Sequence, residues 1–273
     1  STLPREPMGG AIMSGLRYVG MSPNILKVML RAFIFGFTAI VVLALLPVVA
    51  ARIPGGGPLI YGLLLGGFGL GAVGGALYSS RLQTVLGTEA LVRWSFLGFA
   101  VCAWIMAVSP SPWLTAPALM IGGACWVLAL SLFNVTVQLS SPRWVVGRAL
   151  SLYQTATFGG MAFGSWVWGL AAEVYGPSIA LTIAGFGMLG GAAIGLRFAL
   201  PPRTIADLDP LNRFKVPQLE LDIEPRSGPI LIEITYAIKP EDVPAFLLLM
   251  SHRKRIRRRD GARNWSLLRD LGH

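Results

Sequence analysis

The segment GGFGLGAVGG at residues 66–75 contains a spacing typical of nucleotide chemistry. Gly69, Gly71 and Gly74 follow the pattern G-x-G-x-x-G, which lets a backbone approach the pyrophosphate of a dinucleotide. That chemistry requires a preceding strand and a βαβ unit, but here the motif lies in the middle of a long apolar run. Two sets of glycines recur every four residues, on one face of a helix: Gly67, Gly71 and Gly75, and Gly187, Gly191 and Gly195. We therefore interpret these glycines as surfaces for close helix packing in lipid and expect no cofactor.

Neutral polar side chains within the apolar runs could bind a substrate. Amides can hydrogen-bond a small molecule while neighbouring aromatic side chains provide apolar walls. The polar candidates are Asn134, Gln138, Gln154 and Thr157, and the aromatic candidates are Trp126, Phe133 and Phe158. The alternative is interhelical hydrogen bonding within the protein, worth about 0.6 kcal/mol on average. Both interpretations stay open from the sequence.

Ionisable groups are absent from the middle of these runs. Arg31 and Arg93 lie near the ends of their runs, and Glu173 closes another. Because proton-coupled carriers use intramembrane ionisable groups as relays, we expect no coupling carboxylate here. Cys102 and Cys125 both lie in apolar runs and are typical of packing residues. We expect no metal site and no catalytic residues.

The composition indicates a membrane protein. Of 273 residues, 54% are hydrophobic and 13% are charged, where a soluble domain has roughly a quarter charged. A spanning helix needs about 20 mostly apolar residues. Six segments qualify, at 29–51, 57–79, 88–108, 113–139, 149–173 and 178–200, and proline- and glycine-rich turns separate them. The sequence predicts an all-α bundle of six transmembrane helices over residues 23–200.

The distribution of basic residues predicts the orientation of this bundle. Ten lysines and arginines lie near the helix ends on one side, and Arg52 alone lies on the other. Cytoplasmic loops carry the excess of basic residues in membrane proteins. We therefore expect both termini to be cytoplasmic, including an N-terminal segment at 1–22.

The character of the chain changes after residue 200. Residues 201–227 have the composition of a linker. The alternating segment ILIEITYAI at 230–238 predicts a strand, and Pro240 predicts a helix start that buries Val243, Phe246, Leu247 and Met250. NWSLLRDL at 264–271 predicts a second strand. Residues 228–273 would then form a small α+β unit, too short to be stable alone.

A basic run at 253–259 lies within this tail. Its positive residues are Arg253, Lys254, Arg255, Arg257, Arg258 and Arg259. Anionic membrane lipid attracts such runs on the cytoplasmic side, and a solvated helix end is the other ordinary interpretation. We favour these two over a nucleic-acid site.

The loops and turns resemble a known family. LRYVGMSPNILKVMLRAF at 16–33, YGLLLGGFGLGAVGGAL at 61–77, WVLALSLFNVTVQLSSPRWVVGRALSLY at 126–153 and FGGMAFGSWVWG at 158–169 resemble the carboxy-terminal half of a major facilitator superfamily transporter. The similarity is to its enterobactin-exporter-like branch, the transmembrane secretion effectors. The tail segments GPILIEITYAIKPEDVPAF and RRRDGARNWSLLRDL resemble the opening of an antibiotic-biosynthesis-monooxygenase domain, which is ferredoxin-like.

This resemblance implies a function and a location. It implies that the chain is no enzyme, and that it exports a hydrophobic or siderophore-like small molecule by alternating access across the bacterial inner membrane. Its partners would be membrane lipid, the substrate, and the missing N-terminal half or a second copy of the chain. The arginines of the inner gate would be Arg81, Arg93, Arg143 and Arg148. Two other functions stay open: a membrane-anchored monooxygenase-like domain and a self-pairing six-helix protein.

Overall fold

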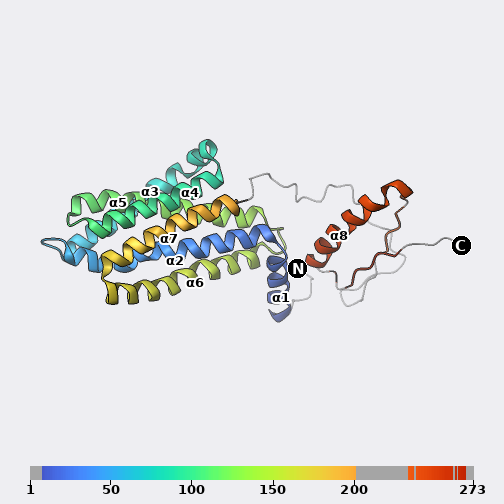
Figure 1. Cartoon of the computed structure of the whole chain (residues 1–273), viewed down its shortest axis with the longest axis horizontal. Coiled ribbons are helices and arrows are strands. Elements are labelled where there is room, and N and C mark those ends of the chain that lie inside the picture. Colours follow the sequence, from blue (N-terminus) through green and yellow to red (C-terminus); the bar gives the residue numbers. More distant parts are fainter. Residues whose placement is uncertain (1–7, 201–232, 237, 261, 263, 269–273) are drawn as a thin grey trace, which may run out of the picture. The chain divides into compact units, whose positions relative to one another are not determined.

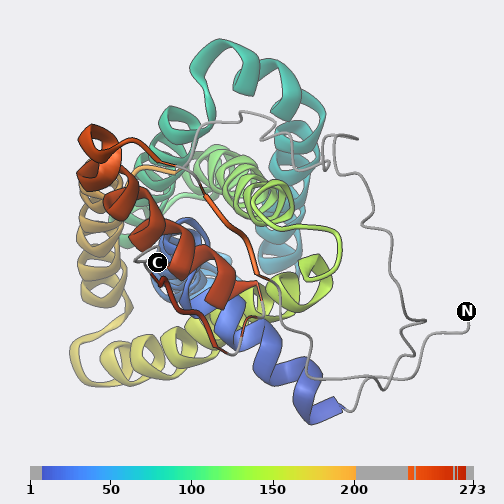
Figure 2. The same cartoon turned by 90° about the vertical axis from the view of Figure 1, so that its right-hand side faces the viewer.

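A long helical bundle dominates the chain. The computed structural model describes residues 8–200, 233–236, 238–260, 262 and 264–268. Its helices are α1 (Met8–Gly20), α2 (Pro23–Arg52), α3 (Pro58–Leu86), α4 (Thr88–Val108), α5 (Pro112–Leu139), α6 (Val146–Tyr175), α7 (Pro177–Arg197), the short η1 (Pro240–Asp242) and α8 (Val243–Arg259). The chain divides into two compact units, residues 23–206 and residues 1–22 with 207–273. Figure 1 shows α2 to α7 side by side along one direction, and the end-on view of Figure 2 shows them gathered into one bundle.

Five of these helices are long and apolar enough to cross a membrane: α2, α3, α4, α5 and α7. Each overlaps one predicted segment, although α2 starts six residues earlier and α3 ends seven residues later than predicted. The chain is therefore a multi-pass membrane protein. The fifth predicted segment, 149–173, lies within α6, which has 30 residues but is not among the five. Its many glycine, serine, threonine and tryptophan residues lower its mean hydropathy. The crossing of the membrane by this helix stays a prediction.

Three helix pairs hold the bundle together: α2 with α6, α3 with α5, and α4 with α7. The first two pairs share one packing mode, in which a glycine of one helix lies against the backbone of the other. A Cβ atom added at Gly71 of α3 would lie closer than 3.0 Å to the backbone of Met120 in α5. A Cβ atom added at Gly160 of α6 would also lie closer than 3.0 Å to the backbone of Phe33 in α2. Without a hydrophobic driving force in lipid, such close approach supplies the van der Waals contact that joins helices.

The two glycine contacts repeat residue by residue. In each pair three positions of one helix face three of the other. The first set is Phe33, Gly36 and Phe37 of α2 against Thr157, Gly160 and Gly164 of α6, and the second is Met120, Gly123 and Ala124 of α5 against Phe68, Gly71 and Gly75 of α3. The α2 and α5 positions have the same spacing along their helices, and so do the α6 and α3 positions. One glycine with positive φ, Gly87 at 76°, joins α3 to α4. Another, Gly176 at 88°, joins α6 to α7 in the same way. The bundle is therefore built from two similarly packed three-helix units, α2–α4 and α5–α7.

The glycine prediction is confirmed for α3 and needs correction for α7. Gly71 and Gly75 of α3 do admit a neighbouring backbone. In α7, however, Gly191 makes room for the ring of Phe96, and Gly195 makes room for the side chains of Arg31 and Glu89. The same four-residue spacing thus accommodates a backbone in one helix and large side chains in another.

The described part of the tail contains a helix but no strand. The helix predicted from Pro240 is present as η1 and α8. Residues 233–236 and 238 of the first predicted strand, and 264–268 of the second, have no strand structure, so the ferredoxin-like prediction is not supported. A strand requires a paired neighbour, and these segments have none among the described residues. Without a sheet to cover them, Val243 and Leu247 are exposed, and Met250 alone is fully buried. The predicted linker at 201–227 lies outside the described residues.

The glycine packing predicts that Gly71→Ala lowers stability while Gly69→Ala does not. The added methyl group of Gly71→Ala collides with the Met120 backbone, whereas nothing lies within 4 Å of a Cβ atom at Gly69. Overpacking typically costs about 1–3 kcal/mol, and alanine improves helix propensity at the open site by up to about 1 kcal/mol. The check is the melting temperature of both variants in detergent. Equal melting temperatures would contradict this packing, and saturable NAD binding by the parent would restore the nucleotide interpretation.

Candidate functional site

A buried arginine marks one end of the bundle. Arg31 lies near the start of α2 and is fully shielded from solvent. A buried guanidinium group is costly unless a partner compensates its charge. Glu89, in the first turn of α4, is that partner, since its Oε2 atom lies 2.5 Å from Nη1 of Arg31. The Arg31 guanidinium also lies 6.0 Å from the centre of the Phe96 ring, close enough for a cation–π contact.

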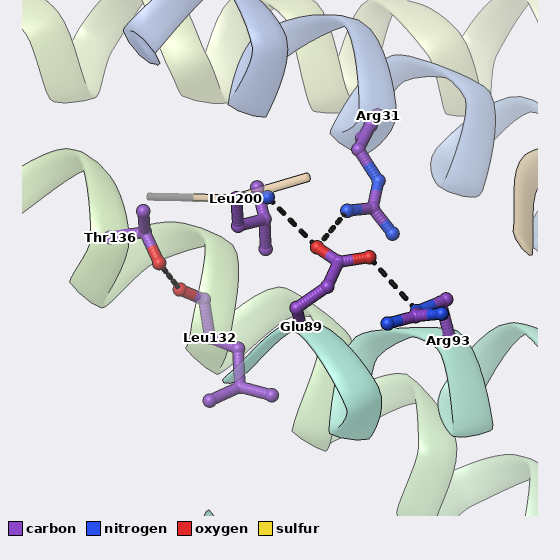
Figure 3. A network of polar contacts seen from close by, with 6 residues as sticks. All are labelled: Arg31, Glu89, Arg93, Leu132, Thr136 and Leu200. Atoms are coloured by element: carbon purple, nitrogen blue, oxygen red, sulfur yellow. Dashed lines mark hydrogen bonds and ion pairs between the residues drawn. The ribbon is translucent and has the colours of Figure 1, made fainter. Parts of the chain in front are cut away.

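Glu89 lies between two arginines. Its Oε1 atom lies 3.2 Å from Nε of Arg93, one turn along α4. Its Oε2 atom also accepts a hydrogen bond of 2.8 Å from the backbone N–H of Leu200, just beyond α7. Figure 3 shows the carboxylate at the centre of these contacts. Its place in the first turn of α4 is favourable as well, because a helix N-terminus attracts negative charge.

The backbone of α7 closes over this ion-pair cluster. A Cβ atom added at Gly195 would lie 2.6 Å from both Arg31 Nη2 and Glu89 Oε1. The cluster of Arg31, Glu89, Arg93 and the Leu200 N–H therefore joins the starts of α2 and α4 to the end of α7. Arg31 Nε and Nη2 are buried and have no hydrogen-bond partner among the described residues. The Arg31 side chain thus depends on Glu89, and separating the pair would be expensive.

The predicted polar residues lie in two different environments. Gln138 is exposed and donates a hydrogen bond to Oδ1 of the half-buried Asn134. Gln154 is exposed on α6. Thr157 is buried, and its hydroxyl donates to the Tyr153 carbonyl of its own helix. The structure therefore places an amide pair on the outer surface of α5 and assigns Thr157 a contact within its own helix.

The predicted aromatic residues also lie in two different environments. Phe133 is fully buried and Trp126 is half-buried, and both pack around the ring of Phe35 in α2, with ring centres 6.3 and 6.2 Å away. Phe96 and Phe99 of α4 complete this cluster. Phe158 is instead 62% exposed on α6. Two of the three predicted apolar walls thus belong to an aromatic core that joins α2, α4 and α5.

Comparison with protein families identifies the chain. The model of the family described as transmembrane secretion effector matches residues 1–273. The chain belongs to the transmembrane secretion effector family. This family consists of transporters of the major facilitator type, which are generally not enzymes. Comparison with curated proteins and with solved structures gave no match.

Among the four gate arginines expected for a transmembrane secretion effector, the ion-pair cluster includes one. Arg93 contacts Glu89, whereas Arg81 and Arg143 are exposed and Arg148 is half-buried. The gate assignment of all four stays a prediction. Our sequence reasoning missed Glu89, although Glu89 and Glu173 are the only two acidic residues between positions 7 and 206. Its spacing of four residues from Arg93 is a recognisable helical ion-pair signal.

The cluster predicts that Glu89→Ala destabilises this secretion effector strongly. The change leaves Arg31 buried without a partner, which typically costs about 3–5 kcal/mol. Arg81→Ala is the matched control, because an exposed side chain of this kind is usually worth less than about 0.5 kcal/mol. The double change Arg31→Met with Glu89→Leu removes both charges and should recover most of the lost stability. Thermal unfolding in detergent measures all three, and similar melting temperatures for Glu89→Ala and Arg81→Ala would contradict the role of the pair.

Proposed function

We propose that this secretion effector exports a hydrophobic or siderophore-like small molecule by alternating access. The observation that carries the proposal is the repeated packing of α2–α4 and α5–α7. Internally repeated helix units that rock against a partner around a central site are a common transporter architecture. Membership of the transmembrane secretion effector family agrees with this function.

The proposal includes α6 as a sixth membrane span. α6 is as long as α2, and the two form one of the glycine-packed pairs. A helix packed in this way against a spanning helix is expected to follow it across the bilayer. With six spans both termini lie on one side, and the excess of arginine there favours the cytoplasm of a bacterial inner membrane.

A second six-helix bundle is part of the proposal, either as a missing N-terminal half or as a second copy of this chain. Ser151, Gln154 and Thr155 are all exposed on α6. Polar side chains in membrane helices usually face protein or a water-filled cavity and not lipid. This side of α6 is therefore suited to a protein partner or to the transport path.

The substrate site is proposed around the amide pair of α5, with Asn134, Gln138, Gln154 and the exposed ring of Phe158 as its candidate residues. Asn134 and Gln138 are the strongest candidates, because their side chains form a hydrogen bond with each other on an accessible surface. A substrate with hydrogen-bonding groups could exchange its contacts with water for contacts with this pair. An apolar side chain at either position would remove that possibility.

We predict that Asn134→Leu and Gln138→Leu impair export with little loss of stability. The hydrogen bond between the two side-chain amides is accessible, so its loss costs the fold little stability. The substrate, in contrast, loses a hydrogen-bonding partner. The measurement is accumulation of a hydrophobic dye or siderophore in cells expressing the full-length transporter, alongside detergent melting. Thr157→Val is the matched control, since among the described residues the Thr157 hydroxyl bonds within its own helix, and the change should leave export unchanged. Normal export by well-folded Asn134→Leu and Gln138→Leu proteins would remove these residues from the site.

The orientation predicts which introduced cysteines react from outside intact cells. Cysteines at Pro110 and Ser178 should react with a membrane-impermeant maleimide, and a cysteine at Val85 should react only after permeabilisation. All three positions are exposed, whereas Cys102 and Cys125 are buried and should give little background. External labelling at Val85 would reverse the orientation, and failure at Ser178 with success at Pro110 would contradict the sixth span.

A further inference from the structure

Two arginines far apart in the sequence line one hollow within the unit formed by residues 1–22 and 207–273. Arg17 of α1 and Arg258 of α8 form its walls together with Gly20, Met21 and Ala262. Both side chains are exposed, and neither makes an ion pair with a described residue. A hollow lined by two arginines, with no carboxylate among its described lining residues, is suited to an anion, above all to a phosphate group.

The chain itself holds this hollow close to the bilayer. Only Met21 and Ser22 separate α1 from α2, so the two helix ends are three residue steps apart and at most about 11 Å from each other. With 30 residues, α2 is about 45 Å long, which exceeds the hydrocarbon thickness of about 30 Å. Part of α2 therefore extends beyond the hydrocarbon layer, and the chain connects α1 directly to the start of this helix.

α1 and α8 both expose apolar side chains beside their basic residues. On α1, Ile12, Met13 and Leu16 lie on one face and are 57%, 67% and 47% exposed. On α8, Leu247 and Leu248 are 52% and 66% exposed. At 3.6 residues per turn they lie on the same side as Arg255 and Arg258. Exposed leucines beside arginines are typical of helices that lie in the membrane interface, and a nucleic-acid site would not require them.

Three of the basic residues of α8 make side-chain contacts with described residues, and three other arginines make none with the part of the chain that the structure describes. The Arg259 guanidinium lies 5.0 Å from the centre of the Tyr18 ring in α1. Arg253 donates to the Tyr236 hydroxyl, and Lys254 lies over the Trp265 ring. Arg255, Arg257 and Arg258 are exposed and have no such contact with a described residue. They give this surface a positive charge that an anionic bilayer would neutralise.

We propose that the hollow between Arg17 and Arg258 binds the phosphate group of an anionic membrane lipid. Arg255 and Arg257 attract the surrounding anionic surface, and the exposed apolar residues of α1 and α8 contact the upper acyl chains. Lipid composition would then control whether α8 lies on the membrane. Nothing in this proposal depends on the identity of the exported molecule.

The test uses the full chain in nanodiscs of phosphatidylcholine alone or with added phosphatidylglycerol. A fluorophore attached to Leu248→Cys reports contact with the bilayer, through protection from aqueous acrylamide and quenching by a lipid-borne nitroxide. We expect both signals in the anionic nanodiscs and neither in the neutral ones. R17Q/R258Q should weaken the association roughly 25-fold, since each basic residue contributes about fivefold near an anionic surface.

The matched control is R81Q/R197Q, which removes the same charge from two exposed arginines near the ends of α3 and α7 and should retain the association. R17K/R258K keeps both charges and should retain most of it, which separates loss of charge from a folding defect. Protection and quenching that do not depend on phosphatidylglycerol would overturn the proposal. Equal loss of membrane association in both glutamine variants would overturn it as well. Inorganic phosphate or RNA that produces the same protection in neutral nanodiscs would overturn it as well, by showing a soluble anion or a nucleic acid to be the ligand.

Discussion

Close approach of helix backbones is the constraint on which the rest of this structure depends. In a bilayer the lipid is as apolar as leucine, so helices gain little from burying leucines against each other. The chain instead places Gly71 and Gly160 where α3 meets α5 and where α6 meets α2. These contacts fix the helix pairs, and the pairs determine where every other side chain lies.

The ion-pair cluster follows from this packing. Arg31 can be buried because Glu89 reaches it from α4 and because Gly195 leaves room for both groups beneath α7. A buried pair of this kind adds little net stability, but loss of one partner is expensive. It therefore acts as a constraint on register, since α2, α4 and the end of α7 must meet in one arrangement. The aromatic core around Phe35 joins α2, α4 and α5 in the same way.

The sequence was sufficient for the spanning helices and insufficient for the contacts between them. Apolar runs and their proline or glycine boundaries predicted the positions of five spans, because the bilayer sets a minimum apolar length. The start of α2 and the end of α3 extend six and seven residues beyond the predicted runs. The four-residue glycine spacing indicated close packing but not the partner, so the difference between Gly71 and Gly191 needed the structure. Glu89 was overlooked because its position near a helix end resembles that of an ordinary solvated acid. Alternation at 230–238 predicted a strand, but a strand depends on a partner that no local pattern reveals.

If the bundle transports by the proposed alternating access, its close helix packing predicts that the six helices move as one unit. The most direct test is the distance between spin labels on Val73 of α3 and Leu170 of α6, which belong to different glycine-packed pairs and are both exposed. Pulsed electron paramagnetic resonance would compare this distance with and without a dye that the cells export. Movement of the bundle as one unit predicts one narrow distribution of distances that is unchanged by the dye. A second population, or a shift of about 5 Å as expected when one helix moves by a turn past another, would contradict it.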